Sequence, residues 1–302
     1  MNNVRRLLEI DEIHRRDICG ENVGVAILDT GISVHEDFTR PYSRILFFKD
    51  FVNKRNGPYD DNGHGTHVSG ICGGSGYLSD GVLKGVAPKC NIIALKVLDE
   101  YGMGTIEHVE EAILWVVDNK NKYGIDIINL SIGSYGAKEA DVKRLTDIVS
   151  YAWDNGITLL TAAGNKGPRP LSITDPGTCK KIITVGAMEE CVSLSKNRRK
   201  RRSFSGCGPT KECIVKPEVV APGCNIASCK STKEYIKKSG TSMATPIVSG
   251  VAALCIGSLK KEAQSKNLIL NRAKINKDIK KALFETSFDL GKDKNKQGWG
   301  LI

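Results

Sequence analysis

The chain has 302 residues, of which 40% are hydrophobic and 26% are charged, which is enough for one large globular domain or two small ones. No apolar run looks long enough to cross a bilayer, so the sequence argues against a membrane partner or a membrane-spanning protein. Lys and Arg number 44 against 34 Asp and Glu, which gives a net charge of +10.

Part of the positive charge lies in one run, KNRRKRR, at residues 196–202. The run has no interleaved aromatic residues, so stacking on nucleic-acid bases is unsupported. A phosphate-binding patch and a site of proteolytic nicking are the alternatives. We expect a solvated surface loop and no nucleic-acid partner.

The first residues, MNNVRRLLEIDEIHRRD, alternate charged residues with Leu and Ile. They lack the apolar core and the small-residue cleavage site of a secretory signal. We therefore expect a cytoplasmic protein, with a non-classical export route left open, and a short N-terminal segment at residues 1–21.

Ten cysteines are scattered along the chain, and none forms a C-x-x-C pair. Cys224 with Cys229, or Cys207 with Cys213, could meet as metal ligands. Scattered reduced thiols, some of them buried as small apolar residues, are the better expectation.

Five short apolar runs, rich in β-branched residues, are the predicted strands. In chain order they lie at 22–31, 91–99, 125–133, 157–165 and 181–188. Their apolar residues are continuous rather than alternating, which is typical of strands that are covered on both faces.

Two helices are predicted between these strands, each from one apolar stripe at helical spacing. The first follows Thr105, a plausible N-cap, and stops at Gly124, and the second stops at Gly156. Alternating strands and helices predict a three-layer α/β fold, with a mostly parallel central sheet flanked by helices. No linker divides the chain, so we expect one domain over residues 22–302.

Chemistry in such sheets gathers at the carboxyl ends of the strands. The first predicted strand ends in Asp29, within the sequence Asp-Thr-Gly. This tripeptide can be a simple turn. It also surrounds aspartic-protease carboxylates, but those require two copies or a dimer, and this chain has one copy.

The sequence GHGTHVSG contains two histidines, His64 and His67. A metal site would need both on a regular helix, with a third ligand and a nearby acid. Glycines flank His64 and place it at a helix start, where its ring is free to point into a cleft as a general base. His67 falls one turn later, where we expect a packed and hydrogen-bonded histidine.

Ser242 lies in Gly-Thr-Ser-Met-Ala, directly before a long apolar helix. It can be an ordinary helix cap. Its small neighbours would also let another chain approach the hydroxyl, and a helix N-terminus offers N–H groups to a developing oxyanion. Asn165, at the end of another predicted strand, can donate to the same oxyanion.

Asp, His and Ser in this order, with an Asn donor between His and Ser, is the order in which subtilisin presents its catalytic groups. The chain resembles the subtilisin-like serine protease (subtilase) family. The matching motifs are DTGI (29–32), HGTHVSG (64–70), AAGN (162–165) and GTSMATP (240–246). GVAP (85–88), KVLD (96–99), NLSIG (129–133), KPEVVAPG (216–223) and QGWG (297–300) extend the resemblance from about Val23 almost to the C-terminus.

The resemblance implies a serine endopeptidase of broad specificity that acts on polypeptides through an acyl-enzyme intermediate and needs no cofactor for the chemistry. Asp29, His64 and Ser242 would form the catalytic triad, and Asn165 with the Ser242 amide would form the oxyanion hole. A catalytically silent subtilase-fold protein that binds peptides or scaffolds a partner is the alternative, but all four residues are present. The sequence does not indicate an oligomeric state.

The resemblance also places the substrate. Two edge strands, one of Gly102, Met103 and Gly104 and the other of Ser131, Ile132 and Gly133, would pair with an extended substrate. Ala163, Gly164 and Lys166 would also bind substrate, with Lys166 at the mouth of the pocket for the P1 side chain. Because Lys166 would disfavour Lys or Arg at P1, we expect apolar P1 residues.

Calcium is common in the family, and residues 76–85 occupy the place of a calcium loop in some members. Asp80 is the sole carboxylate there, and a hard cation requires several oxygen ligands, so structural calcium stays open. Asp175, Glu189 and Glu190 could form a weak second site.

The N-terminal segment is short, with fewer than thirty residues before Asp29. In this respect the chain resembles bacterial intracellular-type members of the family that have no pro-domain. Residues 1–21 could lie over the cleft or dock as a surface helix.

Overall fold

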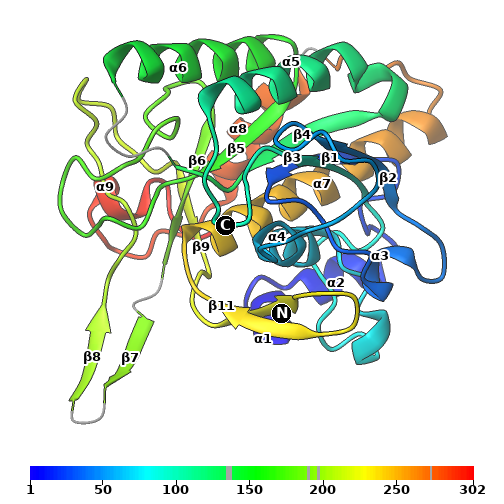
Figure 1. Ribbon diagram of the computed structural model, residues 1–302, viewed down its shortest axis with the longest axis horizontal. Helices are drawn as coiled ribbons and strands as arrows, with labels where there is room; N and C mark the ends of the chain where they lie inside the picture. The colour runs from blue at the N-terminus through cyan, green and yellow to red at the C-terminus, as the bar shows by residue number, and fades with distance from the viewer. Residues whose placement is uncertain (134–137, 189–190, 196–197, 273) are drawn as a thin grey trace.

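A seven-stranded parallel sheet forms the centre of the protein (Figure 1). The computed structural model describes residues 1–133, 138–188, 191–195, 198–272 and 274–302, with the backbone alone for 191–195 and 198–202. The strand order is β2-β3-β1-β4-β5-β6-β9. The bounds are β1 (Gly24–Asp29), β2 (Ile45–Asp50), β3 (Asn91–Lys96), β4 (Ile125–Leu130), β5 (Thr158–Ala162), β6 (Ile183–Ala187) and β9 (Val219–Ala221).

Helices cover both faces of this sheet, which confirms the predicted three-layer α/β fold. α5 (Ile106–Tyr123) and α6 (Glu139–Asp154) lie on one face, and α4 (His64–Gly73) and α7 (Thr241–Ser265) lie on the other (Figure 1). α8 (Ile275–Thr286) packs on β5 and α7. The shorter helices are α1 (Asn2–Leu7), α2 (Ile10–Arg15), α3 (Glu36–Thr39), α9 (Lys294–Gln297) and the 3-10 turn η1 (Tyr77–Ser79).

The five predicted strands correspond to β1 and β3–β6. Almost every residue in them is buried, because helices pack on both faces. The sequence missed β2 and β9. β2 is an edge strand that is only partly buried, and β9 has three residues, so neither gives a long continuous apolar run.

The two predicted helices are confirmed as α5 and α6. The Thr105 hydroxyl accepts a hydrogen bond from the His108 N–H at 3.3 Å and caps α5, and Gly124 ends the helix in the left-handed conformation, at φ 63°. α6 has Asn155 as its C-cap, and Gly156 follows with φ 82°.

The expectation that no apolar run could cross a membrane is wrong for α7. By length and composition alone, this 25-residue helix is long and apolar enough to cross a membrane. It is nevertheless a core helix, because most of its apolar window is buried and it packs against β4, β5 and β6.

Two small hairpins complete the fold, one of β10 (Ile226–Cys229) with β11 (Tyr235–Lys238) and one of β7 (Cys191–Ser195) with β8 (Arg198–Arg202). The β7–β8 hairpin projects away from the body of the protein (Figure 1). Most of the basic run is therefore a strand, not the expected loop, and residues 196–197 lie outside the described part of the chain. Cys224 is disulfide-bonded, so the expectation of reduced thiols is wrong there.

Candidate active site

The candidate acid and base come from neighbouring elements. Asp29 is the last residue of β1, and His64 is the first residue of α4. His64 Nδ1 lies 2.7 Å from Asp29 Oδ1. Asp29 is buried, whereas the His64 side chain is 25% exposed. Because the carboxylate can only accept, Nδ1 carries the proton and the neutral ring keeps a lone pair on Nε2, as a general base requires.

Two features bring α4 this close to the end of β1. Gly65 has no side chain, and a Cβ there would lie 2.3 Å from the Gly31 carbonyl oxygen and 3.1 Å from Asp29 Cβ. Asp60 holds the start of the helix, because its Oδ1 accepts from the Gly63 N–H at 2.8 Å and its Oδ2 accepts from the Thr66 N–H at 2.8 Å. The negative charge thus meets the unpaired N–H groups of a helix N-terminus.

Asp60 also reaches the strand end, since the Thr30 hydroxyl donates to its Oδ1 at 2.8 Å. Burial raises the pKa of Asp60, but its several hydrogen bonds outweigh this and lower the pKa overall. Asp60 was not among the predicted site residues. An acidic residue shortly before a glycine-flanked helix start was the signal that could have found it.

The electrostatics of His64 suit a base that gains a proton during a reaction. Burial lowers its pKa, but the charge and the hydrogen bond of Asp29 outweigh burial and raise the pKa above its ordinary value. Lys238 in β11 acts in the opposite direction and lowers it. Asp29 therefore stabilises the imidazolium form.

His67 is the packed, hydrogen-bonded histidine that the sequence predicted. It is fully buried, and its Nε2 lies 3.0 Å from the carbonyl oxygens of both Ile226 and Ile236. Burial lowers its pKa to about 3, so the ring stays neutral. With Nε2 donating to these carbonyls, the lone pair lies on Nδ1, and His67 belongs to no group of possible metal ligands among the described residues.

Ser242 is the second residue of α7, and so lies inside the helix rather than directly before it as expected. In a regular helix the Ser242 carbonyl would accept from the N–H of the residue four positions later. That residue is Pro246, which has no N–H. The Ser131 hydroxyl donates to that carbonyl instead, at 3.3 Å. In return, the Ser242 hydroxyl donates to the Ser131 carbonyl at 3.1 Å.

The three candidate triad residues are therefore only partly connected. Asp29 and His64 are hydrogen-bonded, but in the described part of the chain no hydrogen bond joins Ser242 Oγ to His64. Such contacts are often loose without substrate and tighten when substrate binds.

Asn165 faces the start of α7 with a fixed orientation. Its Oδ1 accepts from the Thr241 N–H at 3.0 Å and from the Thr241 hydroxyl at 3.2 Å. A backbone N–H can only donate, so the oxygen faces Thr241 and Nδ2 remains as a donor. Nδ2 is the atom nearest to a Cβ built on Gly240, at 3.5 Å, and Asn165 is exposed, so a substrate carbonyl could reach it.

Neither of the two expected substrate-binding segments is paired with another strand in the described part of the chain, so their pairing with a substrate stays a prediction. Residues 131–133 continue past the end of β4 as irregular backbone. Residues 102–104 are exposed, and Gly102 has a φ of 76° in a turn that Asp99 closes by accepting from the Met103 N–H at 2.8 Å.

Thr174 lies between Gly133 and Gly164, one glycine from each of two predicted substrate-binding segments. A Cβ on Gly133 or on Gly164 would lie 2.3 or 2.5 Å from its Oγ1. The Thr174 N–H donates to the Ala163 carbonyl at 3.1 Å, and its buried hydroxyl has no hydrogen-bond partner among the described residues. No sequence motif pointed to Thr174, whereas Lys166 was predicted and is exposed next to Asn165.

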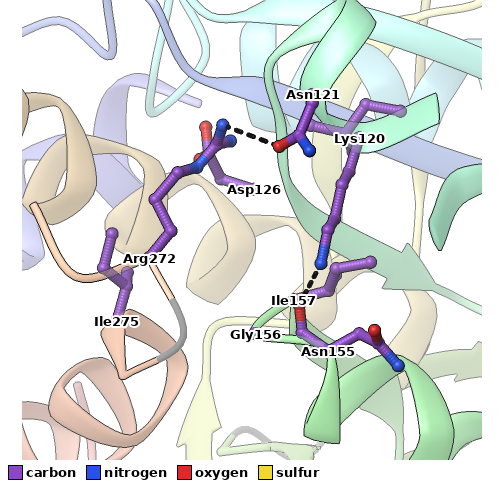
Figure 2. Close-up of a pocket in the computed structure, with 9 residues that line it drawn as sticks. Lys120, Asn121, Asp126, Asn155, Gly156, Ile157, Arg272 and Ile275 are labelled. Carbon is purple, nitrogen blue, oxygen red and sulfur yellow. Dashed lines mark hydrogen bonds and ion pairs between the residues drawn. The ribbon is translucent and has the colours of Figure 1, made fainter. Parts of the chain in front are cut away.

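A separate cavity of about 250 Å³ lies at the amino end of β4, the opposite end from Ser131 (Figure 2). A six-residue strand spans about 20 Å, so this cavity is remote from His64 and Ser242. Its charged side chains are engaged internally: Arg272 donates to Asp126 at 2.8 Å, and Lys120 donates to the Asn155 carbonyl. The cavity is not a candidate active site.

The described residues offer one group with metal-ligand chemistry, His35, Asp37 and Cys229, all of them buried. Hydrogen bonds already engage part of this group: His35 Nδ1 accepts from the Asp37 N–H at 3.0 Å, and the Tyr235 hydroxyl lies 3.0 Å from both carboxylate oxygens of Asp37. His35 Nε2 is buried without a hydrogen-bond partner among the described residues.

The expected weak metal site at Asp175 is not among such groups. Asp175 accepts a hydrogen bond from Thr178, and Glu189 and Glu190 lie outside the described residues.

Comparison with known proteins adds independent findings. The model of the subtilase family, Peptidase_S8, matches residues 20–300. Serine protease AprX of Bacillus subtilis (strain 168) is 41% identical over 261 residues, which is 79% of this chain and 58% of AprX. The major intracellular serine protease of the same strain is 34% identical over 87% of this chain and 77% of its own length.

A solved structure described as that of a cold adapted subtilisin-like serine proteinase superposes with a TM-score of 0.70 at 29% identity. The match covers 92% of this chain and 87% of that chain. This chain therefore spans nearly all of the solved neighbour, but less than two thirds of AprX.

Proposed function

This chain belongs to the subtilase family, and from that premise we propose that it is a serine endopeptidase that hydrolyses peptide bonds of polypeptides. The observation that carries the proposal is the 2.7 Å contact between His64 Nδ1 and Asp29 Oδ1, which leaves Nε2 as a base. Residues 22–302 would form the catalytic domain.

In the proposed reaction, Ser242 Oγ attacks the substrate carbonyl carbon while His64 Nε2 takes the hydroxyl proton. The oxyanion that forms accepts hydrogen bonds from the Ser242 N–H and from Asn165 Nδ2. The intermediate then collapses, the C–N bond breaks, and the leaving amine takes the proton from His64. Water repeats the sequence on the acyl-enzyme and restores Ser242.

Substrate binding would complete the triad. In the free chain the Ser131 carbonyl holds the Ser242 hydroxyl. A main-chain N–H of an extended substrate is a competing donor for that carbonyl. Once displaced, the hydroxyl can turn toward His64, so the nucleophile becomes active when a polypeptide is in place.

The proposed P1 preference is apolar. Thr174 closes the space between Gly133 and Gly164, which limits the size of the P1 side chain. Lys166 is exposed near the pocket and would repel Lys or Arg. A panel of peptides varied only at P1 tests this preference, and strong cleavage after Lys or Arg would reject it.

The surroundings of the reaction are proposals too. The chemistry uses side chains and backbone groups alone, without a cofactor. A cytoplasmic location is supported by the relative that is named as an intracellular protease. Fractionation of the native cell tests it, and recovery of the protein chiefly outside the cytoplasm would reject it.

The test of the function is hydrolysis of an unfolded protein by wild type, Ser242→Ala and Ser265→Ala. Ser265 is an exposed serine at the far end of the same helix, so it is a matched control. We expect wild type and the control to be equally active, and Ser242→Ala to lose about 10⁴-fold or more in kcat while it stays folded. A folded wild type without activity would favour the catalytically silent alternative.

A further inference from the structure

A buried arginine lies against the loop where the family resemblance places calcium. Arg5 in α1 has a side chain that is 6% exposed. Its Nη1 donates to the carbonyl oxygens of Lys84 at 2.6 Å and Val82 at 3.2 Å, and its Nη2 donates to that of Gly81 at 3.2 Å. The guanidinium therefore sits where three backbone carbonyls converge.

The remaining donor of Arg5 is also engaged, because Nε donates to Asp11 Oδ1 at 2.7 Å. Partial burial raises the pKa of Asp11, but the hydrogen bond and charge of Arg5 outweigh it and lower the pKa overall. Asp11 thus stays ionised and balances the cation. All three guanidinium nitrogens of Arg5 have acceptors.

The shape of the loop makes the carbonyls converge. Gly76, Asp80 and Gly81 have φ values of 73°, 46° and 82°, so the backbone reverses sharply within residues 76–81. A Cβ on Gly76 would lie 2.8 Å from the Lys84 N, which shows how closely the two ends of the loop approach. A guanidinium that donates to several converging carbonyls stabilises them through charge-assisted hydrogen bonds.

Calcium does not fit this loop while Arg5 is in place. Ca²⁺ takes six to eight oxygen ligands at about 2.3–2.6 Å, and here the carbonyls that would serve already bind guanidinium nitrogens. A divalent ion beside the guanidinium would be repelled. Asp80, the sole carboxylate of residues 76–85, is exposed.

We propose that Arg5 is a built-in substitute for a metal cation, which holds the 76–85 loop without calcium. On this account, removing the guanidinium leaves the three backbone carbonyls that it binds free to bind calcium. The inference does not depend on the proposed peptidase activity, because it concerns the folding stability of the chain.

The loop supports the helix that carries the candidate base. At its C-terminal end, the Gly85 N–H donates to the Gly74 carbonyl at 2.8 Å, and the Val86 N–H donates to the Ile71 carbonyl at 3.0 Å. Ile71 lies in the last turn of α4, which begins at His64, and Gly74 is the C-cap of that helix. A loosened loop would therefore weaken the anchor of that helix.

The rest of the N-terminal segment docks along the same run of backbone. His14 Nε2 lies 2.9 Å from the Val86 carbonyl, and the Lys89 N–H donates to the Cys19 carbonyl at 2.9 Å. Residues 1–21 thus contribute two short helices, α1 and α2, that pack against the body of the protein.

The experiment measures the Tm of four proteins, in EDTA and in calcium chloride, at one scan rate. All carry Ser242→Ala to prevent self-digestion. The parent has no other change, and the others add Arg5→Ala, Arg5→Lys or Arg6→Ala. Arg6 is the exposed neighbour in α1 and is the matched control.

We expect Arg5→Ala to lose roughly 5–10 °C in EDTA, since buried carbonyls lose their donors, and to gain more from calcium than the parent does. Arg5→Lys should lose less than Arg5→Ala, because its ammonium still reaches some of the acceptors, and it should gain no more from calcium than the parent, because the positive charge remains. Arg6→Ala should match the parent in both solutions.

The proposal is overturned if Arg5→Ala matches the parent in EDTA, or if calcium raises its Tm no more than that of the parent. If Arg5→Ala does not fold in EDTA, its refolding yield becomes the measured quantity. Recovery in calcium supports the proposal, and equal failure in both solutions rejects it.

Discussion

Replacing Asn165 by Asp separates the two jobs that the structure gives this side chain. Asp has nearly the same size, and one of its oxygens can keep the contacts with the Thr241 N–H and hydroxyl. The substitution removes only the Nδ2 donor, which is the group assigned to the oxyanion. Folding should be little affected, and catalysis should suffer.

The size of the loss follows from the chemistry. Removing one oxyanion donor costs about 2.7–4 kcal/mol of barrier, and about 1.4 kcal/mol is a factor of ten, so kcat should fall about 10²–10³-fold. A carboxylate near the oxyanion adds repulsion, which makes this a lower bound. KM should change little, because the lost contact forms mainly in the transition state.

Asn165→Ala is the matched comparison. It removes the same donor and also leaves both Thr241 donors without their acceptor. Thr241 is fully buried, so each unsatisfied donor should cost about 1–3 kcal/mol of stability. The assay is kcat and KM on a chromogenic peptide, with Tm measured on the same samples. A kcat for Asn165→Asp within tenfold of wild type, or an equal Tm loss in both variants, would refute the reasoning.

Three further predictions concern the neighbours of the triad. The Lys238 charge lowers the pKa of His64. Because the base must be neutral to act, Lys238→Gln should move the acid limb of kcat/KM to higher pH, and a profile identical to that of the exposed control Lys237→Gln would contradict this. Thr174→Ala should enlarge the P1 pocket and raise kcat/KM for substrates with Phe at P1 relative to those with Ala. If this ratio of kcat/KM values does not change, Thr174 does not limit the depth of the P1 pocket. Peroxide should partly inactivate wild type but not Met243→Leu, because a sulfoxide adds a polar group beside the nucleophile; full activity with Met243 shown by mass spectrometry to be oxidised would refute this.

The parts of the fold that were predicted are those that the local pattern determines. β1 and β3–β6 are covered on both faces, so their apolar residues run continuously and identify them as strands. β2 at the sheet edge and the three-residue β9 lack that pattern. α7 is as apolar as a membrane span because it is the core helix, and composition alone does not separate the two.

The site was predictable where motif and local geometry coincide. Glycines around His64 placed it at a helix start, and the end of β1 placed Asp29. Tertiary contacts set the rest: the Ser242 hydroxyl rests on Ser131, and Thr174 fills the space between two distant glycines. Arg5 looked like one charge in an alternating segment, and only the folded loop explains its burial.

Labelling by a fluorophosphonate probe tests the central claim most directly, because the probe reacts only with an activated serine. The account predicts that wild type is labelled, and that folded Ser242→Ala and His64→Ala are not. No labelling of folded wild type, or equal labelling of wild type and Ser242→Ala, would contradict it.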